Sequence, residues 1–401
     1  MERQILHVDV NNAFLSWTAV DRLKKGETLD IRTIPAIIGG DEAQRKGIVL
    51  AKSPIAKQFG IQTGEPIYFA RKKCPAICVF QSDFSVYHQY SNNLYELLLE
   101  YTDRIERFSI DECFLDMTTY IPKGRNLLEI AYEINHRVKE ELGFTVNVGV
   151  AHNKLLAKMA SDFEKPNKVH TLWEEQIPQK MWTLPVSELF MVGKKSLPKL
   201  QKMGIKTIGD LAKKDKNSLI KTFGKFGKII SEYANGIDDT PVNYEPEKPK
   251  CIGNSVTLPY DYADKQQLET MLLTIVEQVA YRLRNHHLLA QVVNVQLKTN
   301  EFKVYSHQRK IDMPTDSTKI IQQEAKKLLE ELYKGIPIRL IGVRVDQLTD
   351  GEAMQLSLFQ ENIEEKKQKQ LDKVVDNLKE KYGYEKITRA SHLKQNIKWK
   401  E

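Results

Sequence analysis

Residues 105–117 read IERFSIDECFLDM, and this stretch decides the fold. Apolar residues flank an acidic Asp-Glu pair on both sides, a pattern that predicts two strands joined by a bend. In a flat strand Asp111 and Glu112 would point to opposite faces, but at a hairpin bend both side chains can approach one point. The stretch therefore predicts a hairpin that presents two carboxylates together.

A third acid ends the first apolar run of the chain. Residues 4–9, QILHVD, predict a buried strand that ends at Asp9. By residue type alone, a strand-end turn former and a polar hairpin tip are the simpler explanations of the three acids. Their apolar flanks would bury them, however, and a buried carboxylate needs a metal ion or another cation.

Two magnesium ions suit such a set of acids. Mg²⁺ prefers hard oxygen ligands, and a two-metal site for phosphoryl transfer needs about three carboxylates that converge from separate elements. Asp9, Asp111 and Glu112 supply these carboxylates, and Val10 could add its backbone carbonyl. We therefore expect a phosphoryl-transfer site at the ends of these strands.

The rest of the first half alternates between strand and helix patterns. Further strands are predicted at residues 33–37, 47–51 and 146–151. Helices are predicted from residue 13 and at residues 84–101, 126–141 and 155–163. Mixed elements of this kind indicate an α/β or α+β layer domain.

The second half divides by composition. Residues 179–238 contain small helical patterns between glycine turns, and residues 239–250, DTPVNYEPEKPK, have the composition of a linker. Residues 251–348 read strand, helix, strand, strand, helix, strand, which predicts a second α+β domain with one open sheet face. The charged tail contains a predicted amphipathic helix with Leu371, Val374, Val375 and Leu378.

Charge is concentrated in one segment. The length of 401 residues predicts two to four domains, and a hydrophobic fraction of 41% is enough for folded cores. The net charge of the chain is +7. Residues 186–233 hold eleven lysines against four acids, so their excess equals that of the whole chain. A phosphate-binding face and a solvated lysine-rich helical surface explain this segment equally well.

Cysteine usage and hydropathy bear on the compartment. The four cysteines suggest no disulfide framework, and Cys74 and Cys78 lack a second pair at zinc spacing. No apolar run approaches the ~18 residues of a membrane span, and the N-terminal apolar stretch is too short for a signal peptide. We therefore expect a cytoplasmic protein with no membrane partner.

Three sequence blocks carry a resemblance to a known family. DVNNAF at residues 9–14, SIDECFLD at 109–116 and NKLLAKMASDFEKPN at 153–167 resemble the signature blocks of the Y-family DNA polymerases, in the UmuC/ImpB/MucB branch. The blocks occur in the order and spacing of that family. Together with the lysine-rich segment and the terminal α+β domain, the resemblance covers nearly the whole chain.

The resemblance implies an α+β multidomain right-hand polymerase. The implied parts are a palm at residues 1–178 with small fingers inserted at about 20–77, a helix-hairpin-helix thumb at 179–238, a linker at 239–250, a βαββαβ little finger at 251–349 and a tail at 350–401.

The resemblance also implies roles for individual residues at the active site. Metal binding falls to Asp9, Val10, Asp111 and Glu112, and binding of the deoxynucleoside triphosphate to Asn12, Ala13, Phe14, Lys57 and Lys165. Phe14 would also be the sugar gate that excludes a ribose 2′-hydroxyl, and Ile48 and Leu50 would roof the nascent base pair. Pro54 stands where relatives often have a phosphate-binding tyrosine, and Lys52 or Ser53 could compensate.

Two of these residues also have ordinary explanations. Phe14 alone could be an apolar residue of a first helical turn, and Lys165 could be a plain cation at a helix end.

Contacts with DNA are implied for the helical segment and the terminal domain. The candidates are the hairpin Val192, Gly193 and Lys194, then Lys225, and on the open sheet face Lys298, Lys303, Arg309, Lys310 and Arg344. Met191 stands where relatives often begin the hairpin with glycine. In the tail, Gln355, Leu356, Ser357, Leu358 and Phe359 resemble a peptide that docks into a bacterial sliding clamp.

The implied function is template-directed, low-fidelity DNA synthesis across lesions. The enzyme would be a nucleotidyltransferase that adds deoxynucleotides to a primer 3′-hydroxyl with two Mg²⁺ ions and no proofreading, in DNA repair and the SOS response to DNA damage. Its expected partners are primer–template DNA, deoxynucleoside triphosphates and a sliding clamp, and we expect a monomer that associates with the nucleoid when engaged on DNA.

Two rival functions compete with this one. A non-catalytic DNA-binding repair protein would use the basic hairpins alone, and it predicts substitutions among the three acids. Gly39-Gly40-Asp41-Glu42 is similar to the motif of GGDEF-type nucleotide cyclases, but Ala43 replaces the usual aromatic residue. A hairpin turn explains the two glycines better.

Overall fold

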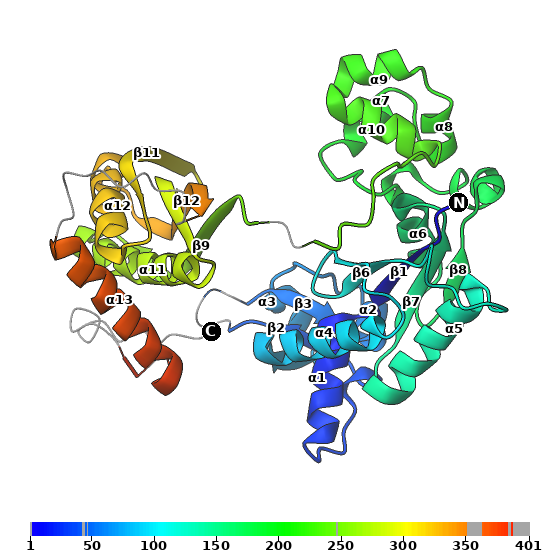
Figure 1. The fold of residues 1–401 in the computed structure, drawn as a ribbon, viewed down its shortest axis with the longest axis horizontal. Helices are drawn as coiled ribbons and strands as arrows, with labels where there is room; N and C mark the ends of the chain where they lie inside the picture. The colour runs from blue at the N-terminus through cyan, green and yellow to red at the C-terminus, as the bar shows by residue number, and fades with distance from the viewer. Residues whose placement is uncertain are drawn as a thin grey trace. The chain divides into compact units, whose positions relative to one another are not determined.

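The computed structural model describes residues 2–41, 45, 47–245, 248–350, 363–383 and 386–387. The chain forms two compact units, residues 1–40 with 48–246 and residues 41–47 with 247–401 (Figure 1). No helix of the described residues is long and apolar enough to cross a membrane.

A five-stranded sheet forms the centre of the first unit. Its strand order is β5 (Ile105–Arg107), β6 (Glu112–Asp116), β1 (Ile5–Val10), β7 (Val146–Ala151) and β8 (Val169–Thr171). The middle strand β1 runs antiparallel to both of its neighbours. The predicted hairpin is confirmed, because β5 and β6 pair antiparallel around the bend that contains Asp111.

Alternation along the buried strands separates two faces of this sheet. Leu6, Val8 and Val10 of β1 pack in one hydrophobic cluster with α1 (Ala13–Lys24), α4 (Phe84–Leu99) and α5 (Leu127–Arg137). The odd-numbered residues point to the other face, which is covered by α6 (Lys154–Ser161). Asp9 therefore points towards α6.

The helix α6 approaches the sheet closely because β7 has glycine at the crossing. A Cβ atom on Gly149 would lie 1.9 Å from the carbonyl oxygen of Ala157 and 2.6 Å from the amide nitrogen of Ser161. Asn153 caps the helix by accepting a hydrogen bond from the Leu156 amide (2.8 Å). These contacts fix the height of α6 above the strand ends.

A smaller three-stranded sheet follows α1 in the chain. Its order is β3 (Val49–Lys52), β2 (Ala36–Gly39) and β4 (Cys78–Gln81), and it packs with α2 (Pro54–Gln58) and α3 (Ile67–Lys73). β2 and β3 begin two to three residues later than the sequence pattern predicts.

Four short helices complete the first unit. They are α7 (Leu197–Lys202), α8 (Ile208–Ala212), α9 (Lys216–Phe223) and α10 (Lys225–Ala234). Short 3-10 or π turns occur at Ile31–Thr33, Val138–Leu142, Glu174–Gln176, Ile177–Met181 and Val186–Glu188. The helices share a hydrophobic cluster with α6 and with Ile5 and Phe114 of the large sheet. The side-chain amide of Asn153 also donates to the Gly236 carbonyl (2.8 Å), which ties α10 to the start of α6.

The second unit is built on a four-stranded antiparallel sheet. Its order is β11 (Val304–Thr315), β10 (Leu288–Thr299), β12 (Ile338–Asp350) and β9 (Cys251–Tyr262). The helices α11 (Lys265–Asn285) and α12 (Thr318–Leu332) cover one face, where Val293, Val295 and Leu297 are buried. The predicted strand–helix–strand–strand–helix–strand order and the open sheet face are confirmed.

The tail helix α13 (Ile363–Tyr382) docks through its polar side. Arg284 of α11 donates two hydrogen bonds to Asp376 (2.6 and 2.9 Å), and Asp372 accepts one from the Thr318 amide (3.1 Å). Leu371 and Val374 are each more than half exposed. The sequence pattern predicted this amphipathic helix, but its apolar stripe faces solvent.

Candidate active site

The three predicted acids gather at one end of the large sheet. Asp9 and Glu112 are register partners on β1 and β6, and both point to the face covered by α6. The Val10 amide donates to the carbonyl of Asp111 (3.0 Å), so the bend is held against the end of β1. Asp9 is only 6% exposed.

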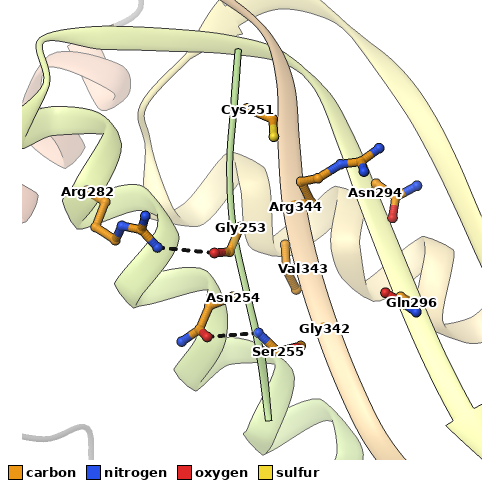
Figure 2. A pocket seen from close by; sticks show the side chains of 10 residues that line it. All are labelled: Cys251, Gly253, Asn254, Ser255, Arg282, Asn294, Gln296, Gly342, Val343 and Arg344. Atoms are coloured by element: carbon orange, nitrogen blue, oxygen red, sulfur yellow. Dashed lines mark hydrogen bonds between the residues drawn. The ribbon is translucent and has the colours of Figure 1, made fainter. Parts of the chain in front are cut away.

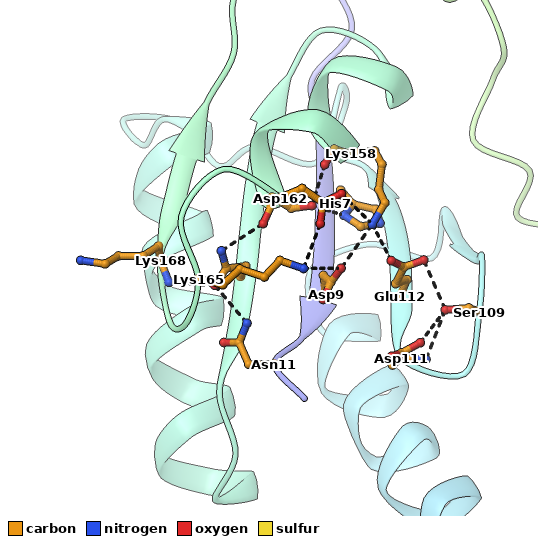
Figure 3. A network of polar contacts seen from close by, with 12 residues as sticks. His7, Asp9, Asn11, Ser109, Asp111, Glu112, Lys158, Asp162, Lys165 and Lys168 are labelled. Atoms are coloured by element: carbon orange, nitrogen blue, oxygen red, sulfur yellow. Dashed lines mark hydrogen bonds and ion pairs between the residues drawn. The ribbon is translucent and has the colours of Figure 1, made fainter. Parts of the chain in front are cut away.

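A lysine that sequence reasoning missed binds two of these acids. Nζ of Lys158 on α6 lies 2.5 Å from Oε1 of Glu112 and 3.3 Å from Oδ2 of Asp9 (Figure 3). Burial alone would lower the pKa of Lys158, but Asp9 and Glu112 outweigh burial and raise it. The lysine therefore stays charged. In the sequence, Lys158 could have been recognised as a candidate because it interrupts the apolar turn Ala157–Met159.

Glu112 is under opposing influences. Burial raises the pKa of its carboxyl above the ordinary value, while the Lys158 ammonium lowers it and Asp9 adds a repulsive charge. A buried and a half-buried carboxylate that already converge on one cation are a donor set suited to hard divalent ions. The residues present therefore fit a metal site.

Asp111 is held apart from the other two acids. The Ser109 hydroxyl donates to Oδ1 of Asp111 (2.7 Å) and lies 3.4 Å from Oε2 of Glu112. In the described part of the chain, the only group of three possible ligands with all ligand atoms within 4.8 Å is Glu2, His152 and Glu174. That group lies near the start of β1, at the opposite end of the strand from Asp9. The imidazole of His152 contacts both of its carboxylates.

His7 connects the strand that carries Asp9 to the end of α6. Its Nδ1 lies 2.8 Å from the Ser161 hydroxyl, which itself donates to the carbonyl of Lys158. Nδ1 of His7 is therefore the donor to that hydroxyl. Burial, and then the charge of Lys158, hold the pKa of His7 well below its usual range. A neutral His7 thus joins β1 to the end of α6.

The loop after α6 brings Lys165 to Asp9. Nζ of Lys165 lies 3.1 Å from Oδ2 of Asp9 and 2.9 Å from Oδ1 of Asp162, whereas Lys168 points away from the acids (Figure 3). Oδ1 of Asn11 accepts a hydrogen bond from the Asn167 amide (2.8 Å), which holds this loop to the end of β1. Asn11 is a positioning residue that the sequence pattern did not single out.

The helix α1 begins at Ala13, directly after the turn that follows β1. Asn12 adopts a left-handed conformation (φ 52°), and its side-chain amide donates to the Lys52 carbonyl (2.8 Å). The unpaired amides of Ala13 and Phe14 follow at the N-terminus of the helix. Phe14 is half-buried on Tyr87, with ring centroids 4.7 Å apart.

The small sheet places the remaining candidates. Lys57 is exposed on α2, and Lys52 is half-buried at the end of β3, where burial and then the nearby Lys57 lower its pKa. Ile48 is 44% exposed, and Leu50 packs against the core of the large sheet.

Ser53 is not free to replace a phosphate-binding tyrosine. It is fully buried, its oxygen caps α2 by accepting from the Ala56 amide (3.0 Å), and its hydroxyl donates to the Ile34 carbonyl (2.7 Å). The expectation that Ser53 could compensate for Pro54 is therefore wrong.

Two glycine-containing turns expose lysines in the helical part of the first unit. Val192 is buried in the hydrophobic cluster, whereas Gly193 and Lys194 are exposed. Met191 has a φ of 71°, a conformation that favours glycine. In the second turn Gly224 precedes exposed Lys225.

The open sheet face of the second unit is polar and hollowed. Lys298 and Arg344 lie on it, beside a depression lined by Gly253, Gly342 and polar side chains (Figure 2). A Cβ atom on Gly253 would lie 3.0 Å from Cβ of Arg344, so glycine keeps the hollow open.

The other candidate residues of this unit lie on different faces of the sheet. Lys310 lies on the open face opposite Val292. Arg309 instead projects to the helix side, where it pairs with Glu331 and with Glu324 (3.7 Å). The expectation that Arg309 lies on the open face is therefore wrong, because its register partner Val293 points into the core. The clamp-like peptide at residues 355–359 lies outside the described residues.

Comparisons with known proteins support one family. A model of the impB/mucB/samB family matches residues 8–162, and a model of the C-terminal domain of that family matches residues 249–358. A protein named DNA polymerase IV from Clostridium acetobutylicum is 46% identical over 398 residues, covering 99% of this chain and 100% of that protein. Another from Acetivibrio thermocellus is 37% identical, covering 97% of each chain.

A solved structure shares the fold. A chimera of the Y-family DNA polymerases Dbh and Dpo4 superposes with a TM-score of 0.75 at 24% identity, covering 87% of this chain and all of the chimera.

Proposed function

Because this chain belongs to the impB/mucB/samB family, it is a Y-family DNA-directed DNA polymerase of the translesion type, and we propose that Asp9, Asp111 and Glu112 hold the divalent ions of its nucleotidyl transfer. The observation that carries this assignment is the convergence of Asp9 and Glu112, from paired strands, on one buried cation.

Two Mg²⁺ ions would complete the site. When bound, they lower the pKa of the primer 3′-hydroxyl and offset the charge that develops on the phosphates. Asp9 and Glu112 supply carboxylates from adjacent strands, and the Val10 carbonyl lies at the same strand end. Asp111, whose carboxylate accepts a hydrogen bond from the Ser109 hydroxyl, would supply the third carboxylate.

The triphosphate would lie against the N-terminus of α1. Unpaired amides of Asn12, Ala13 and Phe14 at a helix N-terminus favour phosphate oxygens. Lys165, already 3.1 Å from Asp9, would neutralise charge on the reacting side, and Lys57 would do so from α2. Lys52 is a further candidate, since the Asn12 side chain binds its carbonyl.

Phe14 would act as the sugar gate. Its ring is backed by Tyr87, which is fully buried, so the ring cannot retreat from an added hydroxyl group. Ile48 and Leu50 would roof the base pair, the former being largely exposed.

DNA would be gripped through its backbone. Gly193 presents a backbone amide beside exposed Lys194, a combination that binds phosphates without reading sequence. The Gly224 amide donates to the Ile220 carbonyl (2.8 Å), so the second turn would offer the exposed ammonium group of Lys225 instead. Lys298, Lys310 and Arg344 would contact phosphates from the open sheet face. In this proposal residues 1–178 are palm and fingers, 179–238 thumb and 251–349 little finger.

The cellular setting is also proposed. The peptide at residues 355–359 would tether a monomeric enzyme to a sliding clamp and so raise its local concentration at the primer. We place the enzyme in the cytoplasm, on the nucleoid when bound to DNA, in the SOS response to DNA damage.

Primer extension with matched acid variants tests the metal assignment. Asp111→Asn should abolish template-dependent extension with Mg²⁺. Asp116→Asn is the control, because Asp116 lies in the same hairpin but only caps the Thr118 amide (2.9 Å). Equal loss in both variants, or none in Asp111→Asn, would refute the assignment.

Ribonucleotide incorporation tests the gate. Phe14→Ala should reduce the preference for deoxynucleotides by about tenfold or more. Phe84→Ala, which removes a ring 6.1 Å from Phe14, should leave it unchanged. Unchanged discrimination in Phe14→Ala would contradict the gate.

A further inference from the structure

Lys158 is a charged side chain of the site that no assigned role uses. It projects from the middle of α6 and is 8% exposed, so its ammonium group has little access to water. Its Nζ contacts three carboxylates, those of Glu112 (2.5 Å), Asp162 (3.2 Å) and Asp9 (3.3 Å). Two of these are proposed metal ligands.

Its neighbour one turn earlier shows what an ordinary structural lysine does on this helix. Lys154 binds both oxygens of Glu106 (2.6 and 2.8 Å), an acid outside the metal set. The Glu106 carboxylate also accepts a hydrogen bond from the Asn243 amide (2.6 Å), so this pair ties the sheet to the segment after α10.

We propose that Lys158 is a resident counter-cation of the metal site, which positions Asp9 and Glu112 and competes with divalent ions for their oxygens. The proposal rests on the proposed metal ligands. Two carboxylates held side by side with little access to water repel each other, and a charged lysine between them removes that cost before any ion arrives. The oxygens that face Nζ are then unavailable to a divalent ion until the ammonium moves.

Asp162 is an alternative partner for the ammonium group of Lys158 once a divalent ion displaces it. It is one turn along α6 from Lys158, its carboxylate is already 3.2 Å from Nζ, and its side chain is 43% exposed. A rotation of the lysine side chain towards Asp162 would release Glu112 and leave Asp9 with Lys165 alone, without leaving the Lys158 charge unpaired. Lys158 is thus a positioning residue and not a group that touches the reacting atoms.

Binding of Mn²⁺ alone, without DNA or nucleotide, tests the proposal by the spectroscopic signal of free Mn²⁺. At pH 8, Lys158→Met should bind Mn²⁺ at least about tenfold more tightly than wild type, because the variant lacks the ammonium group that repels the cation and competes with it for the carboxylate oxygens. Its melting temperature without metal should fall, and the rise on adding Mn²⁺ should exceed that of wild type. Lys154→Met should bind Mn²⁺ as wild type does.

The outcomes separate failure of this proposal from failure of the proposed metal site. If Asp9→Asn leaves Mn²⁺ binding intact, the metal assignment is wrong and the proposal falls with it. If Asp9→Asn abolishes binding while Lys158→Met binds no more tightly than wild type, the metal site stands and the counter-cation role is overturned.

A second variant covers a Lys158→Met protein that does not fold. Asp162→Asn removes the alternative partner of Lys158, and the second partner of Lys165, and so holds both ammonium groups on the metal-site acids; it should weaken Mn²⁺ binding severalfold. Unchanged or tighter binding in Asp162→Asn would overturn the proposal.

Discussion

Replacing Gly149 with alanine tests how the fold positions the site. The added Cβ would lie 1.9 Å from the Ala157 carbonyl oxygen and 2.6 Å from the Ser161 amide nitrogen, both in the backbone of α6. Contact distances below about 3 Å are not tolerated, so the helix must retreat by about 1 Å. Overpacking costs about 1–3 kcal/mol, and we expect about 3 kcal/mol here, because no flexible side chain can give way.

The retreat of α6 also displaces lysines of the active site. Lys158 lies in the middle of this helix, and the loop that follows it carries Lys165 to Asp9. A displacement of about 1 Å at reacting groups costs about 10²-fold in rate. Gly149→Ala should therefore lower both stability and primer extension.

Urea unfolding followed by tryptophan fluorescence measures the stability term, since Trp17, Trp173 and Trp182 all lie in the first unit. Gly193→Ala is the matched control, because its Cβ would meet no atom within 4 Å. An unfolding free energy for Gly149→Ala within about 0.5 kcal/mol of wild type would refute the reasoning, since changes of that size are typical of uninvolved surface sites.

Three further changes have defined outcomes. Asn153→Ala removes the cap of α6 and its bond to the next segment, and should cost about 2 kcal/mol in urea unfolding. Arg284→Met removes the paired hydrogen bonds to Asp376 and should make α13 cleavable by limited proteolysis at lower protease concentration, whereas equal resistance would show that α13 is held otherwise. The double variant Lys194→Ala with Lys225→Ala should weaken duplex binding equally across sequences and reduce the slope of log K against log salt by up to about 2, while a sequence-dependent loss would contradict backbone contact.

Much of the architecture could be predicted from sequence because its signals are local. Alternation in Val293, Val295 and Leu297 reports a strand with one buried face, and the acid pair within 105–117 marks a bend, whatever the rest of the chain does. The element order of both units follows from such patterns. The acids themselves are visible because they interrupt apolar runs.

Long-range contacts could not be predicted in the same way. The register that sets Asp9 opposite Glu112 joins residues more than a hundred positions apart, and the Gly149 contact lets α6 bring Lys158 between them. The apolar neighbours of Lys158 indicate burial, but nothing local shows that it binds metal-site acids while Lys154 binds an acid outside the metal set.

The same division between local pattern and tertiary contact applies to the faces of α13. The sequence determined that α13 is amphipathic, but the ion pairs of Asp372 and Asp376 with Arg284 turned its polar side inwards. A periodic pattern fixes which residues share a face, since that depends on backbone geometry alone. Which face is buried depends on the partners that the tertiary structure brings against it, and here the acids of α13 pair with Arg284 of α11.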